Sequence, residues 1–193
     1  MIPVAKVKKP KNFDKEVKTP GAAWLSNNPA VARPKALWAP FTSDLSAGFA
    51  NLCGYAAMLD ATGGTVDHYL SVKNHRHLAY EWGNYRFASG TLNASKRNAD
   101  DKVLDPYEVG AGWFEVLLPS LQLVVTDAVP PGHRAKAEFT LERLKLRDGE
   151  RVLRWRKSWY DMYLDGKMTL AGLRDVAPLV AAAVDKAAQK SRR

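Results

Sequence analysis

The chain has 193 residues, of which 46% are hydrophobic and 10% aromatic, and its formal net charge is +9. A chain of this length and composition can bury a core of its own, so we expect one folded domain with extensions. No apolar stretch approaches the roughly 20 residues of a membrane span, and the first residues lack the apolar region of a secretory signal. The lone Cys53 has no disulfide partner, which is typical of a reducing compartment. We therefore expect a cytoplasmic protein with no membrane association.

Positive charge is concentrated at the two ends of the chain. Residues 1–40 carry eight Lys and Arg against two acids, and residues 151–193 carry ten against four, whereas residues 41–150 carry eleven against fourteen. Basic segments around a central site suit a polyanion such as nucleic acid, because Lys and Arg displace condensed counterions from phosphates. A solubilising surface would have the same composition, so charge alone leaves both interpretations open.

The elements expected in the first part of the chain are short. Residues 1–20 combine Lys and Pro with little apolar periodicity, which predicts an extended arm that orders only against a partner. A short helix is expected around residues 22–25, and a second helix over residues 41–52 with Thr42 or Ser43 as its N-cap.

The segment TVDHYLSVKNHRHLAYEWGNYRFASGTLNASKRN, residues 65–98, predicts a β-hairpin followed by a helix. Ser89 is the expected N-cap of the helix. The parts are a strand over 65–70 with an Asp-His pair at its end, a polar loop over 71–83, a strand over 85–88 and a helix over 91–98. This order would place Asn93, Lys96 and Arg97 on neighbouring positions of one helix face.

The remainder of the chain predicts strands in WFEVLLPSLQLVV and then helices over 134–146, 150–164 and 169–189. The expected fold is therefore α+β, mainly helical with a small β element at its centre. We expect three parts: a basic N-terminal arm with a short helix (1–40), a central core (41–130) and a C-terminal helical extension (131–193).

The hairpin segment contains a set of residues with the chemistry of a metal-dependent hydrolase. The carboxylate of Asp67 and the amide oxygen of Asn93 are ligands of the kind that Mg²⁺ accepts. The imidazole of His68, neutral at physiological pH, can take a proton from water. Neighbouring side chains on a strand point to opposite faces, so Asp67 and His68 can reach one site only if the strand bends or ends there. An ordinary turn pair is the alternative interpretation of Asp67-His68.

With its downstream residues, this segment resembles the HNH endonuclease family, whose ββα-metal motif has an Asp-His pair, an Asn in the hairpin and an Asn on the helix, often followed by Lys. The matching residues here are Asp67-His68, Asn84, Asn93 and Lys96. The resemblance implies that Asp67 and Asn93 bind Mg²⁺ or Mn²⁺ and that His68 is the general base. It also implies that Asn84 holds the hairpin loop and orients His68, and that Lys96 contacts phosphate.

Many relatives in this family, including small defence-associated HNH nucleases, carry two Cys pairs that bind a structural zinc. Here Cys53 is retained but Ala56 stands at the second position, and no Cys lies near the helix. The resemblance therefore implies no structural zinc, with packing of Tyr55, Met58 and Leu59 in its place. The segment AEFTLERLKLRDGERVLRWRKSWY is also similar to the helical tail of those defence nucleases, where the tail joins the nuclease to a partner or to DNA.

The function implied by the resemblance is metal-dependent cleavage of DNA, with RNA not excluded, in anti-phage defence or restriction. A small nuclease would be toxic if unregulated, so we expect a regulatory partner, such as an ATPase or sensor, or a homodimer that gates it. The alternative is a catalytically silent nucleic-acid-binding or assembly subunit that keeps the HNH scaffold.

Further candidate contacts to nucleic acid are basic residues of the helix and the C-terminal segment and two loop histidines. They are Lys96, Arg97, His75, His77, Arg154, Arg156 and Lys157. Four of these have a simpler interpretation: a solvated helix face for Lys96 and Arg97, and exposed loop positions for the two histidines. Trp155 and Trp159 lie four residues apart and either pack in the core or present an aromatic surface to a base.

Overall fold

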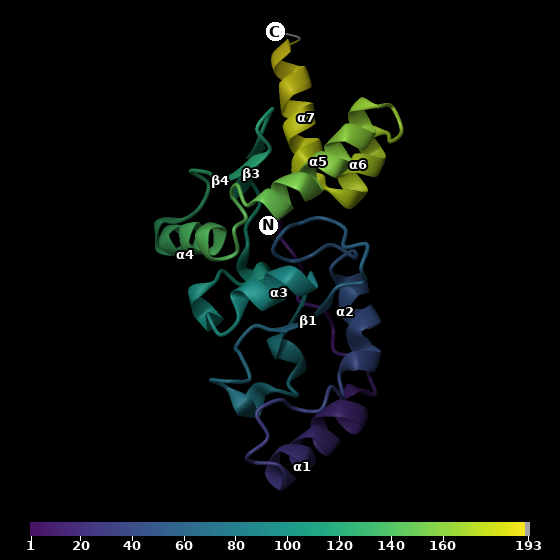
Figure 1. Ribbon diagram of the computed structural model, residues 1–193, viewed down its shortest axis with the longest axis vertical. Coiled ribbons are helices and arrows are strands. Elements are labelled where there is room, and N and C mark those ends of the chain that lie inside the picture. Colours follow the sequence, from purple (N-terminus) through teal and green to yellow (C-terminus); the bar gives the residue numbers. More distant parts are fainter. Residues whose placement is uncertain (192–193) are drawn as a thin grey trace.

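The computed structural model describes residues 1–191 and shows an α+β fold, with helices around two small antiparallel sheets (Figure 1). The α-helices are α1 (Thr19–Asn27), α2 (Thr42–Gly48), α3 (Gly90–Lys96), α4 (Pro131–Arg143), α5 (Glu150–Leu164), α6 (Leu170–Val176) and α7 (Pro178–Ser191). The strands are β1 (Thr65–His68), β2 (Tyr85–Ala88), β3 (Phe114–Leu117) and β4 (Gln122–Val125). None of the helices in this described part of the chain is both long enough and apolar enough to cross a membrane.

The predicted hairpin and helix are present. Strands β1 and β2 pair antiparallel, with Asp67 opposite Arg86 and His68 opposite Tyr85. The first strand ends at His68, two residues earlier than expected. Ser89 caps α3 as predicted, because its side-chain oxygen accepts a hydrogen bond from the Leu92 amide at 3.3 Å. The Asp-His pair therefore lies at the end of β1.

The N-terminal arm differs from the prediction. A short helical turn over Asp14–Lys18 runs directly into α1, so the second half of the arm is helical. Phe13 and Val17 have no exposed surface, and the Phe13 ring lies 5.1 Å from the Trp82 ring. The expectation that the arm orders only against a partner is wrong, because these two apolar residues, four positions apart among lysines, share a helical face that packs on the chain itself.

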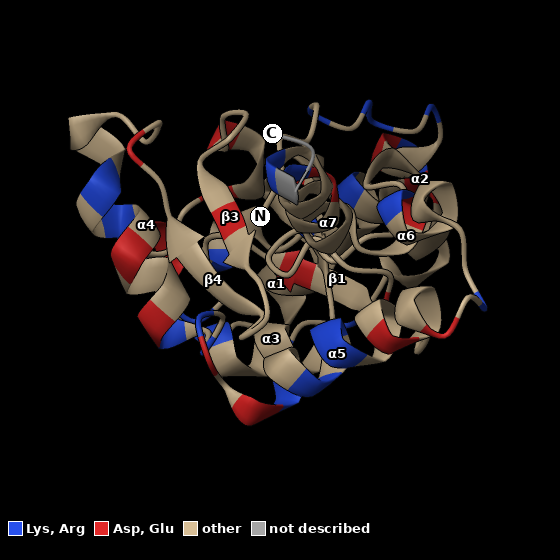
Figure 2. Cartoon of the chain, turned by 90° about the horizontal axis from the view of Figure 1, so that it is seen from above, with Lys and Arg blue, Asp and Glu red and all other residues tan. Residues whose placement is uncertain are grey.

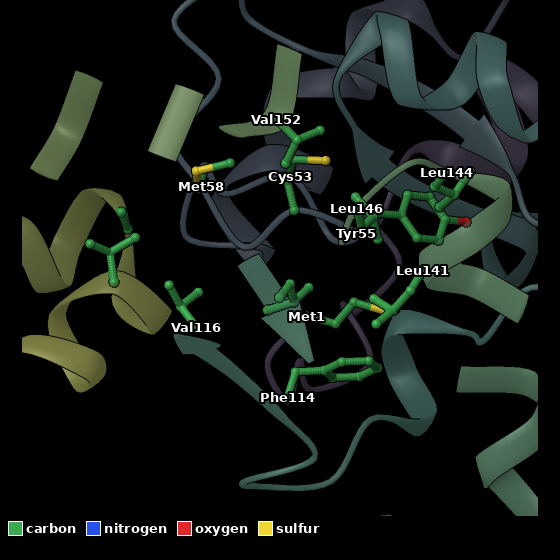
Figure 3. Packing of buried hydrophobic residues seen from close by; sticks show 14 of the residues in the cluster. Met1, Cys53, Tyr55, Met58, Phe114, Val116, Leu141, Leu144, Leu146 and Val152 are labelled. Atoms are coloured by element: carbon green, nitrogen blue, oxygen red, sulfur yellow. The ribbon is translucent and has the colours of Figure 1, made fainter. Parts of the chain in front are cut away.

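Two clusters of buried apolar residues form the core. The hairpin cluster joins the arm, α2 and the hairpin loop, and consists of Phe13, Val17, Phe41, Leu45, Phe49, Val66, Ala79, Tyr80, Trp82, Tyr85 and Phe87. The C-terminal cluster joins the β3–β4 sheet and helices α4 to α7 to residues before the hairpin, and Figure 3 shows part of it. Met1 lies in this second cluster beside Leu141 and Phe114. The hairpin and α3 lie between the two clusters.

Prolines and residues with positive φ angles set several of the helix ends. The prediction for α5 is confirmed at both ends, and β3 and β4 lie in the predicted segment. The single helix expected over 169–189 is divided into α6 and α7, since Ala177 precedes Pro178 and adopts a non-helical conformation (φ −151°, ψ 66°). Helix α2 ends at Gly48 instead of residue 52, because Ala50 and Asn51 have positive φ angles.

The two tryptophans of α5 have a packing role. Trp155 and Trp159 are partly buried against the C-terminal cluster, which agrees with the core-packing interpretation. Lys and Arg lie along the outer face of α5, on the same side of the molecule as α3 (Figure 2).

Candidate functional site

The end of β1 directs Asp67 and His68 to different sides of the strand. Asp67 is buried against Tyr55 and Lys96, whereas His68 packs beside Trp38 and Tyr85. This is the alternation expected of neighbouring residues in a strand. The strand ends at His68, as a common site would require, but the two side chains have no partner in common among the described residues.

The His68 ring is held in place by one hydrogen bond and two aromatic contacts. Its Nε2 lies 2.8 Å from the carbonyl oxygen of Ala79, and the ring centroids of Trp38 and Tyr85 lie 4.6 and 5.1 Å away. A carbonyl can only accept, so Nε2 must carry the proton, which leaves Nδ1 as the basic nitrogen. Burial lowers the pKa of His68 and outweighs the opposing effects of the Ala79 contact and the Asp67 charge. The imidazole is therefore neutral at physiological pH.

Asn84 closes the hairpin loop. Its Oδ1 accepts a hydrogen bond from the Leu70 amide at 2.8 Å, and its Nδ2 donates to the carbonyl of Leu70 at 2.9 Å and to that of Leu78 at 3.3 Å. Leu78 precedes Ala79, whose carbonyl contacts His68. Asn84 thus fixes the stretch of loop that positions the imidazole, which is the contact pattern expected of a residue that holds the loop and orients His68.

Asp67 is enclosed by a tyrosine and a lysine. Its side chain is only 2% exposed; the Tyr55 hydroxyl donates to Oδ2 at 2.6 Å, and the Lys96 ammonium donates to Oδ1 at 3.0 Å. The same ammonium donates to the carbonyl of His68 at 2.9 Å and lies 5.8 Å from the Tyr69 ring centroid. Burial, and next the Asp67 charge, raise the pKa of Tyr55, so its hydroxyl remains a donor.

This arrangement corrects the expectation for α3. Lys96 has no exposed surface, so it does not lie on a solvated helix face and does not present its charge to phosphate in this conformation. Arg97 follows the last helical residue, with φ 52°, and is exposed. The helix ends one residue too early for Arg97 to share its face with Lys96.

Asn93 lies on α3 above the same strand and is half-buried. Its Nδ2 donates to the carbonyl of Val66 at 3.3 Å, which leaves Oδ1 as the atom that can accept a ligand. Asn93 and Asp67 therefore lie on the same side of the hairpin, the side covered by α3.

The oxygen atoms around Asp67 have the chemistry of a cation site. The carboxylate of Asp67 and the carbonyl of His68 already hold a positive charge, the ammonium of Lys96. Asn93 is bonded through its Nδ2 to the carbonyl of Val66, the residue before Asp67. The carboxylate and carbonyl oxygens suit a hard divalent ion. The ion would have to displace Lys96 from Asp67 to bind there. Within residues 1–191, no group of three or more His, Cys, Asp or Glu side chains could hold a metal ion.

The predicted contacts of α5 with nucleic acid divide into three cases. Arg154 is exposed and paired with Glu150, and Lys157 is exposed and paired with Asp161. Arg156 is 1% exposed and donates to the carbonyls of Leu121, Leu146 and Arg147, which rules out its predicted role on the surface. Burial lowers the pKa of Arg156 to about 10.

The two loop histidines lie beside the loop that Asn84 closes. His75 is half-buried, with Nε2 3.7 Å from Oδ2 of Asp100, and His77 is exposed beside it. Asp100 itself accepts hydrogen bonds from the Ser71 amide and the Asn74 side chain. This network ties the loop to the segment after α3, and neither histidine touches Asp67 or His68 in any contact of the described residues.

Side-chain packing holds the segment around Cys53, which precedes the hairpin. Cys53 is buried, and its sulfur accepts a hydrogen bond from the Ser89 amide at 3.2 Å, at the N-cap of α3. Tyr55 and Met58 are 0% and 1% exposed in the C-terminal cluster, as predicted for them, and Figure 3 shows them on either side of Cys53. The segment before the hairpin is thus anchored to α3 through its side chains.

Sequence reasoning missed two parts of the site. The first is the pair of aromatic residues beside the site: Trp38 lies against the His68 ring, and Tyr55, expected only to pack, donates to Asp67. The second is a buried ion pair beneath the hairpin, in which Arg86 donates to both carboxylate oxygens of Asp105 at 2.6 Å. Arg86 in the strand pattern YRFA was the one available signal, because an arginine in a strand of buried residues needs a partner.

Comparisons with protein-family models, with curated proteins and with solved structures found no match to this chain.

Proposed function

We propose that this protein is a metal-dependent endonuclease of the HNH kind that hydrolyses phosphodiester bonds in DNA, with His68 as the general base. One observation carries the proposal: at the end of a strand, the Ala79 carbonyl holds the proton of His68 on Nε2, burial keeps the ring neutral, and the preceding residue, Asp67, holds the ammonium of Lys96. Both lie in a hairpin followed by a helix that carries Asn93.

In the proposed mechanism each residue of the site has a separate role. His68 takes a proton from the attacking water at Nδ1, which is unprotonated because burial lowers the pKa of the ring. Asn84 and Ala79 keep the imidazole in one orientation and one tautomer. Asp67 and Asn93 would hold Mg²⁺ or Mn²⁺, which would neutralise charge on the phosphate and stabilise the leaving oxygen.

The position of Lys96 has a consequence for regulation. While its ammonium neutralises Asp67, the carboxylate is unavailable to a divalent ion. The isolated chain is then expected to cut slowly until Lys96 moves away, and a partner such as an ATPase or sensor, or a second copy of the chain, would act at this step. An ungated nuclease would be toxic, which agrees with a role in anti-phage defence or restriction.

The test is cleavage of supercoiled plasmid and of labelled single strands by the purified protein with Mg²⁺, Mn²⁺ or EDTA. We expect metal-dependent cutting that falls at least about 100-fold in His68→Ala, the range of a lost general base. His133→Ala is the matched control, because this histidine lies on α4 and contacts Trp113 instead of the site. Equal cutting by wild type and His68→Ala would overturn the proposal.

A second function is favoured by the Asp67–Lys96 pair itself. An acid that is buried and neutralised from within the chain is typical of a structural residue, and a catalytically silent subunit that binds nucleic acid would retain the same fold. Binding of DNA without cleavage, unchanged by Mg²⁺ and by His68→Ala, would support this alternative.

A further inference from the structure

A cleft between α3 and the connection from α4 to α5 is lined almost entirely by basic and hydroxyl side chains. Its volume is about 520 Å³, and its lining residues are Thr91, Ala94, Ser95, Arg97, Arg143, Lys145 and Arg151. Four of these are cations and, of the described residues that line it, none is acidic. Of these four cations, only Arg97 is among the residues named above as candidate contacts to nucleic acid.

Most of these cations are not engaged elsewhere. Arg97, Lys145 and Arg151 are exposed, and within residues 1–191 none of the three forms an ion pair. Their neighbours Arg147, Arg154 and Lys157 are each paired with an acid: Glu138, Glu150 and Asp161. The basic residues of this region therefore form two sets, and the unpaired set lines the cleft.

The fourth cation holds the two sides of the cleft together. Arg143, at the last residue of α4, donates to the carbonyl of Lys96 at 3.3 Å, which joins α4 to the end of α3. Because Lys96 also holds Asp67, the cleft is connected through one residue to the candidate catalytic site. Arg143 is half-buried, so its position is more fixed than those of the exposed cations.

The cleft continues along α3. Thr91 and Arg151 also line an adjoining hollow of about 490 Å³ that reaches Trp155 and Thr62. A second adjoining hollow, of about 400 Å³, shares Thr91, Ser95, Lys145 and Arg151 with the cleft. We call the cleft and the two adjoining hollows together the groove. Its cations lie in the cleft, Trp155 and Asp60 line one adjoining hollow, and Glu150, which pairs with Arg154, lines the other. Figure 2 shows the Lys and Arg of α5 beside α3, on the side where this groove lies.

We infer that this groove binds the sugar-phosphate backbone of nucleic acid, through Arg97, Arg143, Lys145 and Arg151. Unpaired cations along an open groove suit a chain of phosphates, because each neutralised phosphate releases condensed counterions. Hydroxyls of Thr91 and Ser95 add neutral donors of the kind that contact phosphate oxygens. A single small anion would need few of these groups and would leave the rest of the groove empty. The inference deepens the proposed function and rests on it only in taking this nucleic acid to be the substrate.

The experiment measures binding separately from cleavage. A labelled single-stranded oligonucleotide and a labelled duplex are titrated by fluorescence anisotropy in EDTA, where a metal-dependent nuclease does not cut. The groove variant is Arg97→Gln/Lys145→Gln/Arg151→Gln. The control variant, Lys15→Gln/Lys102→Gln/Lys190→Gln, loses the same charge from exposed residues outside the groove.

We expect the groove variant to bind at least one of the two probes about tenfold more weakly than the control variant. The slope of log affinity against log salt should become shallower by about 2, from three lost contacts at about 0.7 each for a single strand. Equal affinities for the two triple variants would overturn the inference, since net charge alone would then explain binding. Displacement of the oligonucleotide by inorganic phosphate at matched phosphate concentration would also overturn it in favour of a small-anion site.

Failure of this inference is distinguishable from failure of the proposed function. If the groove variant loses affinity but the wild type never cuts, the groove is the binding site of a silent subunit. If the wild type cuts with Mg²⁺ and the groove variant binds like the control variant, the nuclease stands and its substrate binds elsewhere.

Discussion

Two buried ion pairs lie on the two strands of the hairpin and differ in how firmly they are fixed. Asp67 on β1 and Arg86 on β2 occupy opposing positions, yet each pairs with a residue from outside the hairpin, Lys96 and Asp105 respectively. Arg86 donates to both oxygens of Asp105 at 2.6 Å and lies 4.0 Å from the Tyr107 ring centroid. Lys96 makes one contact with Asp67 and one with a backbone carbonyl.

The difference indicates which pair is structural and which is exchangeable. A guanidinium matches a carboxylate in two parallel hydrogen bonds, and its planar group also stacks on aromatic rings, so no other cation replaces it without loss. An ammonium is a compact point charge on a flexible stem, and the oxygens that hold Lys96 are those that a divalent ion also accepts. We therefore expect the Arg86–Asp105 pair to stabilise the fold and the Lys96–Asp67 pair to respond to added metal.

The largest effect is expected for Asp105→Asn. This change leaves Arg86 charged and buried without its partner, and it weakens the contact of Asp105 with the Tyr107 amide. Breaking a buried pair from one side costs about 3–5 kcal/mol. Urea unfolding of the variant should show this loss, whereas Asp101→Asn, at an exposed neighbouring acid, should change stability by less than about 0.5 kcal/mol. A small loss in Asp105→Asn would contradict the structural role of this pair.

A smaller loss of folding stability is expected for Lys96→Met, and added metal should reverse it. Asp67 loses its counter-charge but keeps the hydrogen bond from Tyr55, so we expect a loss of about 3 kcal/mol in EDTA, at the lower end of the range for a buried pair broken from one side. Adding Mg²⁺ or Mn²⁺ should raise the unfolding midpoint of Lys96→Met, because an ion that binds only the folded state stabilises it.

The double variant Lys96→Met/Asp67→Asn is the control for this rescue, since it lacks the carboxylate that the ion would need. A midpoint of Lys96→Met that does not respond to metal would show that Asp67 and Asn93 form no divalent site. The Lys96–Asp67 pair would then be as structural as the Arg86–Asp105 pair.

The smallest expected change is in the pH dependence of folding stability, through the protonation of His68. Burial lowers the pKa of His68 in the folded state, so near the usual pKa of histidine the unfolded chain binds more protons than the folded one. This contribution makes stability rise as pH increases from the folded pKa to about 6.5 and then level off. His68→Gln should remove that part of the pH dependence of urea unfolding, and an unchanged dependence would contradict a buried, neutral imidazole. Cleavage should likewise stay constant down to a pH below the usual range of histidine before it falls.

Local signals in the chain predicted much of the fold near the site. Strand β2, the Ser89 cap and both ends of α5 follow from alternation, capping chemistry and helical periodicity, which act over a few residues. The arm was misjudged because two apolar residues among lysines give a weak periodic signal, and their helix is stabilised by contacts with Trp82 and Tyr85 far along the chain. Local propensity cannot reveal such a contact.

The amino-acid sequence by itself determined which groups the hairpin and α3 carry and in what order: an Asp-His pair, a loop asparagine, and an asparagine and a lysine one helical turn apart. Tertiary structure alone decided which of these groups are buried and which partners they pair with. Packing of α3 on β1 turned Lys96 inward onto Asp67, and packing of α4 and α5 beside α3 gathered unpaired cations into one groove. The physical reason is that spacing along the chain fixes which side chains can share a face, whereas burial and pairing depend on segments distant in sequence.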